Sequence, residues 1–466
     1  MRNKSVAEIL HKVLEKVRPS REELRAEKEV AEKVMKHIRQ LKGKHIETMM
    51  VGSTARNTHL KGDRDIDIFV LYPKELSREE FEKDGLRIGK EVFKGHEWRQ
   101  EFAEHPYIRG NIEGFEIEIV PSYKVDRASE LLSAVDRSPF HMKYLSGKMA
   151  ERQKDEARLL RAFLKGIDCY GAKLSVNSVP GYVVELLILK YGNFLKCLEA
   201  VSDWKKETII DLEGHWKEKE EECGKKFQHH HLIVVDPTDG NRNVAAALSF
   251  NQFARFIAAA RRFLEKPDER FFFRKKEKPF SAANLREKLA DRRLIVAEMP
   301  YPKNTHPEII TGQLKKLKNK LKIQLALNEF GVIDLKEWAN EKNLIAFVIE
   351  PKDLELEKIR KHTGPEVTDR KASENFLNAH KGIEGGPRIE NGKWVVEKKR
   401  KHWNAAEFVK WYFRDELKRE KEPLKGAMGK AKIYRKEEAL NLYRKDESFR
   451  EFFTKFLKGK EEFLEY

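Results

Sequence analysis

The hydrophobic positions in the first forty residues repeat with the period of an α-helix. Apolar side chains recur three and four positions apart over residues 6–17, and Pro19 interrupts the pattern. Ser20, followed three residues later by Glu23, has the sequence form of a capping box, in which each side chain satisfies a backbone N–H group. We therefore predict two amphipathic helices, of which the second begins after Ser20 and reaches Leu41.

From His45 the pattern changes to the shorter period of β-strands. The segments richest in β-branched and aromatic residues predict strands at 47–51, 66–72, 107–112 and 115–120. The last two form a hairpin about Glu113-Gly114. A second capping box at Ser77 to Glu80 begins a helix that ends near Phe93. These elements predict an α+β unit that ends near residue 140.

The rest of the chain alternates between helical and strand-like patterns. Residues 151–275 are mainly helical, with helices predicted at 156–165, 182–190 and 244–264. Beyond Pro279 we predict strands at 294–299 and 344–350, a basic amphipathic helix at 313–330, and a hairpin about Asn391-Gly392. Residues 405–466 are predicted to be helical and are highly charged. The pattern divides the chain into four predicted domains: 1–150, 151–275, 276–355 and 356–466.

Composition adds the kind of partner to this picture. Lys and Arg total 94 against 77 Asp and Glu, which gives a net charge of +17, and 40% of the residues are hydrophobic. That hydrophobic content predicts packed cores rather than disorder, and the positive excess favours a polyanion such as nucleic acid. No apolar run is long enough for a membrane span, and the three cysteines have no paired spacing. We expect a soluble, cytoplasmic protein without a membrane partner, a disulfide framework or a Cys-rich zinc finger.

The residues that indicate chemistry begin where the first predicted strand ends. Gly52 lets a phosphate group approach the backbone, and Ser53 adds a hydroxyl at the start of a short helix, whose free N–H groups attract anions. Asp65 and Asp67 stand at i and i+2 of the next strand, so that their carboxylates share one face. Adjacent carboxylates beside an anion site require a hard cation. Mg²⁺ fits, because it combines one or two carboxylates with phosphate oxygens.

A third carboxylate is available on the strand predicted at 115–120, where Glu116 and Glu118 face the same way. The combined set indicates in-line nucleotidyl transfer, with one Mg²⁺ activating a primer hydroxyl and another holding the triphosphate and the departing pyrophosphate. Each motif alone is weak, because Gly-Ser pairs are common turns and D-x-D is common at strand edges. Their combination in a strand–turn–helix context is far more specific.

The same residues carry a resemblance to a known family. Gly52-Ser53, Asp65-x-Asp67 and the later strand carboxylate are the pattern of the DNA polymerase beta-like nucleotidyltransferase superfamily. The string from Gly52 to Gly62 resembles the archaeal, class I CCA-adding enzymes, which build or repair the 3′ CCA end of tRNA without a nucleic-acid template. Further matching strings lie at 133–141, 170–172, 181–187, 236–237, 242–245, 364–365 and 375–377.

The resemblance implies a role for each matching residue. The catalytic, metal-binding carboxylates would be Asp65, Asp67 and Glu118. The nucleotide-binding residues would be Gly52, Ser53, Arg56, His141, Arg161, Tyr170 and Arg242, with Arg242 facing the Watson–Crick edge of the base. Two positions depart from the family, which usually has Asp in place of Glu118 and Lys in place of Arg161. The longer Glu118 side chain moves the metals or bends to compensate, and Arg161 replaces a point charge with a planar fork.

The resemblance also implies the architecture and the partners. The fold would be multidomain α+β: a nucleotidyltransferase-type mixed sheet with flanking helices over 1–150, then a helical neck over 151–275 that recognises the base. A C-terminal α+β body over 276–355 and a tail over 356–466 would bind tRNA. The implied cofactor is Mg²⁺, the substrates are ATP, CTP and tRNA, and the assembly is a homodimer. Two alternatives remain open: another RNA nucleotidyltransferase of the superfamily, with poly(A)-type or partial CCA addition, and a noncatalytic tRNA-binding protein.

Overall fold

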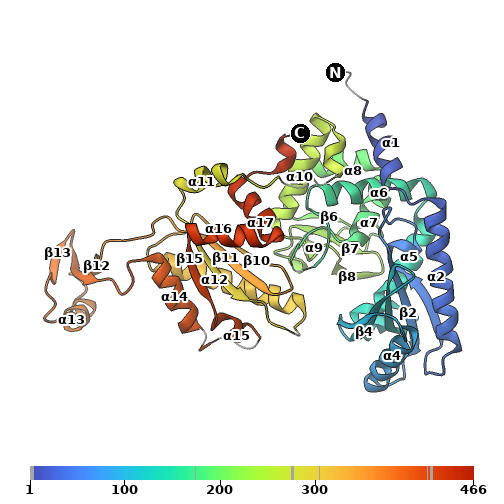
Figure 1. Ribbon diagram of the computed structural model, residues 1–466, viewed down its shortest axis with the longest axis horizontal. Helices are drawn as coiled ribbons and strands as arrows, with labels where there is room; N and C mark the ends of the chain where they lie inside the picture. The colour runs from blue at the N-terminus through green and yellow to red at the C-terminus, as the bar shows by residue number, and fades with distance from the viewer. Residues whose placement is uncertain are drawn as a thin grey trace. The chain divides into compact units, whose positions relative to one another are not determined.

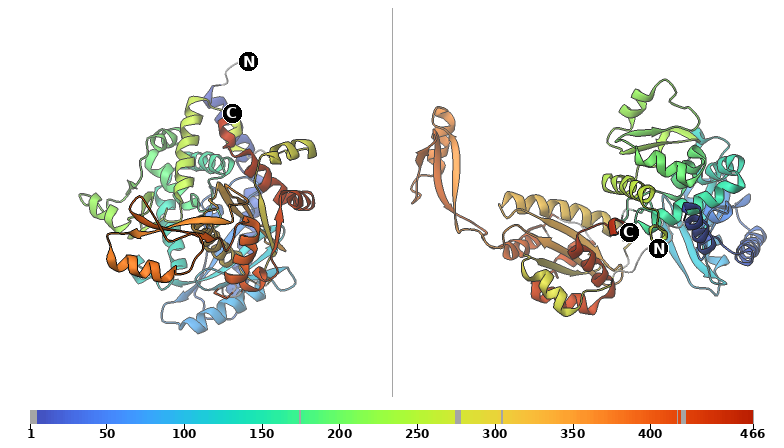
Figure 2. Two further views of the ribbon diagram at one scale, coloured as in Figure 1. Left: turned by 90° about the vertical axis from the view of Figure 1, so that its left-hand side faces the viewer. Right: turned by 90° about the horizontal axis from the view of Figure 1, so that it is seen from above.

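The computed structural model describes residues 5–173, 175–273, 278–303, 305–416, 418–419 and 423–465. The chain folds into two compact units, of which the first comprises Met1–Lys275 with Lys460–Tyr466 and the second Lys276–Gly459. Figure 1 labels the elements along the chain, and Figure 2 gives two further views.

The first unit contains a five-stranded mixed sheet in the order β1-β2-β5-β4-β3. Its strands are β1 (Glu47–Val51), β2 (Asp65–Pro73), β3 (Trp98–Phe102), β4 (Pro106–Ile112) and β5 (Phe115–Lys124). Only β2 and β5 run parallel to each other; the other neighbours are antiparallel. The helices α2 (Arg21–Gln40) and α4 (Arg78–Val92) cover one face, where Ile66, Ile68 and Ile117 are fully buried. The opposite face carries the acidic residues, since side chains alternate along a strand.

A helical layer completes the first unit. It consists of α1 (Val6–Val17), α5 (Arg137–Lys148), α6 (Glu151–Gly166), α7 (Gly181–Tyr191), α8 (Phe194–Ser202), α9 (Glu220–Lys226) and α10 (Phe250–Glu265). A three-stranded sheet joins it, formed by β6 (Thr208–Ile210), β7 (Leu232–Asp236) and β8 (Asp239–Asn243). The core of this layer is rich in phenylalanine. Phe463 belongs to this core, from a short 3₁₀ helix at Glu462–Glu465, and the carboxylate of Glu461 pairs with Arg255 of α10.

The second unit is built on a four-stranded antiparallel sheet in the order β10-β11-β9-β15. Its strands are β9 (Ile295–Pro300), β10 (Asp334–Ala339), β11 (Leu344–Glu350) and β15 (Lys432–Arg435). One core forms between this sheet and the helices α12 (Pro307–Leu327), α14 (Ala405–Glu416) and α15 (Leu424–Met428). A second core involves α11 (Ala282–Ala290), α16 (Lys436–Lys445) and α17 (Glu447–Lys458). Because the two cores use alternate residues of the strands, the helices cover both faces of the sheet.

A separate small sheet follows within the second unit. It has the order β12-β14-β13, from β12 (Ile359–Glu366), β13 (Arg388–Glu390) and β14 (Lys393–Lys399), and α13 (Arg370–Ala379) packs on β12. Asn391 and Gly392 both have positive φ between β13 and β14, so the predicted hairpin is confirmed.

Three local expectations differ from the structure. The helix predicted to begin at residue 244 begins at Phe250, because Ser249 accepts a hydrogen bond from the N–H group of Gln252 and caps it. Residues 432–435 form the edge strand β15 rather than helix. The second capping box is only half formed: Ser77 caps α4, but the carboxylate of Glu80 accepts from the Ser77 hydroxyl instead of the backbone.

Candidate active site

The predicted Gly-Ser turn connects β1 to the short helix α3 (Gly52–Ala55). Gly52 has φ +79°, and a Cβ atom at this position would overlap Oδ2 of Asp67. The position therefore requires glycine both for its backbone conformation and for the space beside the acid. The Thr54 hydroxyl donates a hydrogen bond to the Asp65 carbonyl oxygen at 2.6 Å, which ties the turn to the start of β2.

The parallel pairing of β2 and β5 brings the predicted acids together. Asp65 lies opposite Glu116 and Asp67 lies opposite Glu118, so that all four carboxylates lie on the face away from α2 and α4. Burial, together with the charges of Glu118 and Asp65, raises the pKa of Asp67 to about 7. Burial also raises the pKa values of Asp65 and Glu118. A set of desolvated oxygen ligands that repel one another fits a hard divalent cation such as Mg²⁺.

Arg109 of β4 also belongs to this acidic cluster, although no motif in the sequence indicates it. It lies opposite Glu118 in the β4–β5 pairing. Its guanidinium contacts Glu118 at 3.1 Å, Glu116 at 2.5 Å and Asp65 at 3.7 Å. The signal that could have revealed this neighbour is the predicted hairpin about Glu113-Gly114, because its two-residue turn places Arg109 opposite Glu118.

Arg56 follows α3 and is held by a buried acid. Its Nη2 and Nε donate hydrogen bonds of 2.7 and 3.0 Å to the two carboxylate oxygens of Glu185 on α7. The Thr58 hydroxyl donates to the same carboxylate, which is fully buried. Sequence reasoning assigned no role to Glu185, although a charge within the apolar run of α7 is a signal for a buried partner.

Arg161 and Tyr170 form a second buried group. The Arg161 Nη1 donates a 2.7 Å hydrogen bond to the Tyr170 hydroxyl. Its Nε and Nη2 atoms are buried and donate no hydrogen bond to any residue that the structure describes, and Nη2 lies 3.9 Å from Glu185. A guanidinium with two unused donors has capacity left for an anionic ligand.

His141 and Arg242 meet at the buried carboxylate of Asp236. The Nε2 atom of His141 lies 2.8 Å from Asp236, and Nη1 of Arg242 lies 2.9 Å from it. Burial raises the pKa of Asp236, but hydrogen bonds from His141 and Thr238 outweigh burial and hold that pKa well below its usual range. The His141 ring also stacks on Tyr182, with the ring centroids 3.9 Å apart. Asp236 thus orients two predicted nucleotide-binding residues, a role that its sequence context did not indicate.

The fold and the acidic cluster define the class of protein: a nucleotidyltransferase. A family model described as a nucleotidyltransferase domain matches residues 31–141, which contain the turn and the three predicted catalytic acids. Two further models match the rest, the second domain of tRNA nucleotidyltransferase over 155–273 and the C-terminal domain of the CCA-adding enzyme over 294–420.

Comparison with individual proteins identifies the family. The CCA-adding enzyme of Methanocaldococcus jannaschii is 37% identical over 81% of this chain and 84% of its own length. Those of Archaeoglobus fulgidus and Saccharolobus shibatae are 36% and 35% identical, over 87% and 86% of this chain and 89% and 91% of their own lengths. This chain therefore belongs to the CCA-adding enzymes, as the resemblance indicated. A solved structure of Cid1 poly(U) polymerase with MgATP is 13% identical and covers 59% of this chain and all of its own, with a TM-score of 0.47.

Across the described part of the chain, no helix is both long and apolar enough to span a bilayer.

Proposed function

We propose that this protein adds or repairs the 3′-terminal CCA of tRNA from CTP and ATP in the cytoplasm, by Mg²⁺-dependent nucleotidyl transfer with release of pyrophosphate. The observation that carries the proposal is the row of carboxylates on the parallel strands β2 and β5 beside the Gly52 turn, in a chain of the CCA-adding family.

Asp65, Asp67 and Glu118 are proposed to hold the metal. Mg²⁺ bound by carboxylates supplies charge neutralisation at phosphate oxygens. In this chain Asp67 is placed against the turn and Glu118 lies beside it on the next strand. The desolvated carboxylates are also the groups available to accept the proton of the primer hydroxyl.

The nucleotide is proposed to bind at the turn and the neighbouring buried groups. Gly52 and Ser53 would contact the triphosphate, joined by the unused donors of Arg161 beside Tyr170. Arg56 would contribute its Nη1, because Nε and Nη2 are held by Glu185. His141 and Arg242, oriented by Asp236, would face the base, where guanidinium donors suit acceptors of both cytosine and adenine.

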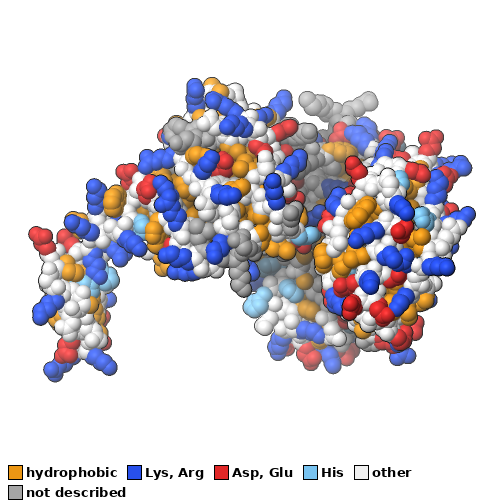
Figure 3. All heavy atoms as spheres, turned by 60° about the horizontal axis from the view of Figure 1, so that its bottom comes forward, with side chains coloured by type: hydrophobic (Ala, Val, Ile, Leu, Met, Phe, Trp, Pro, Cys, Tyr) orange, Lys and Arg blue, Asp and Glu red, His pale blue; other side chains and the backbone are white. Residues whose placement is uncertain are grey.

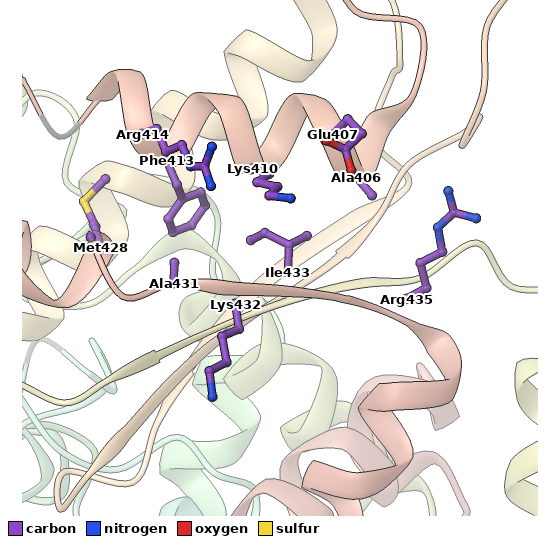
Figure 4. A pocket seen from close by; sticks show the side chains of 11 residues that line it. Ala406, Glu407, Lys410, Phe413, Arg414, Met428, Ala431, Lys432, Ile433 and Arg435 are labelled. Atoms are coloured by element: carbon purple, nitrogen blue, oxygen red, sulfur yellow. The ribbon is translucent and has the colours of Figure 1, made fainter.

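The tRNA is proposed to bind through basic surfaces that include the second unit. A pocket of about 380 Å³ lies among α14, α15 and β15. Lys410 and Arg414 project from α14 toward β15, whereas Lys432 points away (Figure 4). Neither Lys410 nor Arg414 has an ion pair with any residue that the structure describes, so both are available to backbone phosphates. Figure 3 shows Lys and Arg side chains on many parts of the visible face, interspersed with Asp and Glu.

A homodimer is part of the proposal. It is supported by two exposed apolar side chains one helical turn apart on α12, Ile323 and Leu327. The mass in solution, measured by light scattering during gel filtration, tests this part separately, because a monomer would remove the dimer and leave the reaction intact.

The reaction is tested with a tRNA that lacks its CCA end, with CTP and ATP supplied singly and together. We expect C, C and A to be added in order and addition to stop. Unlimited addition of A from ATP alone would favour a poly(A)-type enzyme, and cessation after cytidine would favour partial addition.

Asp67→Asn tests the role of the acids. We expect loss of incorporation with tRNA affinity within about threefold of the unmutated protein, because a single neutralised metal ligand prevents charge neutralisation without altering the RNA surface. If the unmutated protein also fails to incorporate nucleotides while it binds tRNA, the noncatalytic alternative is favoured.

A further inference from the structure

Four charged side chains form one row across the sheet of the first unit. The strand registers align Asp67 of β2 with Glu118 of β5, Glu118 with Arg109 of β4, and Arg109 with Arg99 of β3. Directly opposite residues point to the same face. Two acids are therefore followed by two bases along a single row, and the change of sign falls between Glu118 and Arg109.

Arg109 is the basic residue of this row that pairs directly with the proposed metal ligands. Its Nη1 lies 3.1 Å from Glu118, and its Nη2 lies 2.5 Å from Glu116 and 3.7 Å from Asp65. The Tyr107 hydroxyl also donates to Glu118, at 3.4 Å. Glu118 is thus turned toward β4. Accordingly, no three acidic, histidine or cysteine side chains among the described residues converge as a ready set of metal ligands.

We propose that Arg109 is a positioning residue that occupies Glu118 as an internal counter-ion and releases it when a divalent cation binds. This inference rests on the proposed function, since it concerns the same three acids. A guanidinium next to a carboxylate repels a divalent ion at that carboxylate. The site therefore binds a divalent cation weakly until Arg109 moves away or the negative charge of a bound triphosphate offsets the positive charge of Arg109.

The surroundings allow Arg109 to change partners. The Nη2 group of Arg109 is paired with Glu116, which is not a proposed metal ligand. The guanidinium therefore keeps one ion pair when it leaves Glu118. Arg99 also binds Glu116, at 3.1 Å, and holds that carboxylate in place. A pocket of about 680 Å³ lined in part by Trp98, Arg99 and Arg109 gives the side chain room to move. The Arg109 Nε has no hydrogen bond to a described residue that would resist the movement.

The test is a titration of the full chain with Mn²⁺ at pH 7.5, followed by the electron paramagnetic resonance signal of the free ion, with no nucleotide or tRNA present. We expect Arg109→Met to tighten Mn²⁺ binding about tenfold or more, because the competing charge is lost. Arg99→Met is the matched control. It removes the same charge from the neighbouring strand, but among the described residues Arg99 forms ion pairs with Glu101 and Glu116 and with none of the three proposed metal ligands. The Mn²⁺ affinity of this variant should therefore stay within about twofold of that of the unmutated protein.

A gain of metal affinity cannot arise from misfolding, which would weaken the site. Arg109→Lys keeps the charge and should stay within about threefold of the unmutated protein, and Arg109→Gln replaces Arg109→Met if the latter does not fold. Unchanged or weaker binding in the neutral variants, or equal tightening in Arg99→Met, would overturn the inference. If the unmutated protein and Asp67→Asn bind Mn²⁺ equally, the proposed metal site itself fails, which is a different result.

Discussion

The raised pKa of Asp67 reflects the unfavourable burial of this carboxylate beside other carboxylates in the folded chain. Its pKa is raised to about 7 from an ordinary value of 3.8 by burial and by its acidic neighbours. The folded protein therefore keeps a proton that the unfolded chain has lost between about pH 4 and pH 7. The free energy of unfolding contributed by this group falls as pH rises through that window and stays low above it.

Asp67→Asn should accordingly stabilise the metal-free protein. At pH 8 with a chelator present, we expect the free energy of unfolding to rise by about 1 to 2 kcal/mol. This is less than the free energy equivalent to the full pKa shift, because the side chain is only half-buried. The gain should shrink as pH falls toward 4 and vanish near pH 3, below both pKa values, where the acid is protonated in both states. Urea unfolding at the two pH values measures it. Asp65→Asn is the control, because Asp65 is more exposed than Asp67 and the neighbouring Arg109 offsets part of the rise in its pKa, so it should gain less. A variant less stable than its parent at pH 8 would contradict this account.

At the same scale, the residue types that carry the proposed chemistry were predictable and their partners were not. Gly52, Asp65 and Asp67 stand close together in sequence, so spacing alone indicates that they share one end of β2. Glu185 and Asp236 reach Arg56 and His141 from distant segments, and only the folded chain brings them together. Arg109 faces Glu118 across the predicted hairpin, but its ion pair with Glu118 was not anticipated.

At the scale of elements, the connection from β1 to β2 offers a matched pair of glycines, Gly52 at the start of α3 and Gly62 in the loop before β2. Gly52 and Gly62 have φ of +79° and +80°, but a Cβ atom at Gly62 meets nothing within 4 Å, whereas one at Gly52 overlaps Asp67. Both alanine variants should lose about 1 kcal/mol of stability from backbone strain. Only Gly52→Ala should also displace Asp67, and we expect its incorporation rate to fall about 100-fold. Single-turnover incorporation and thermal unfolding measure the two effects. Equal rate losses would show that strain, not overlap, matters.

Elements were predicted best where the deciding interactions are local. The capping box of Ser20 and Glu23 is present at the start of α2, as predicted, because both partners lie within one helical turn. The strand β15 was missed, since its four residues become a strand only by pairing with β9. The start of α10 was misplaced because apolar residues continue through 244–248, which precede its cap, Ser249.

At the scale of the whole molecule, the final segment contributes to the core of the first unit. Phe463 is buried there, and the centroid of its ring lies 6.4 Å from that of Phe271. Its neighbour Leu464 is exposed. Phe463→Ala should therefore lower the free energy of unfolding by about 3 kcal/mol. Leu464→Ala should leave it unchanged, and chemical denaturation compares the two. Equal stability of both variants would mean that the segment is not part of the stable fold.

The net charge of +17 makes binding of tRNA dependent on salt. Each phosphate contact that is lost reduces the slope of log affinity against log salt by about 1 or less. The double variant Lys410→Ala, Arg414→Ala should reduce the steepness of that slope by about 1 to 2. A double variant of Arg25 and Lys28, which removes equal charge from ion-paired positions on α2, should not. Filter binding over a salt series measures both, and identical slopes would exclude the α14 pocket from the RNA surface.

The sequence by itself determined the α+β class, the approximate bounds of the first two helices and of the strands β1, β2, β4 and β5, the Gly-Ser turn and the family. These follow from periodicity, caps and motifs, which act over a few residues. The tertiary structure alone decided that Asp67 adjoins Glu118 and that Arg109 lies against both Glu118 and Glu116. Those neighbours depend on strand order and register, which arise from the packing of the whole sheet. Strand pairing also explains why a chain of net positive charge has its proposed chemistry at a cluster of acids, with the Arg109 guanidinium among them.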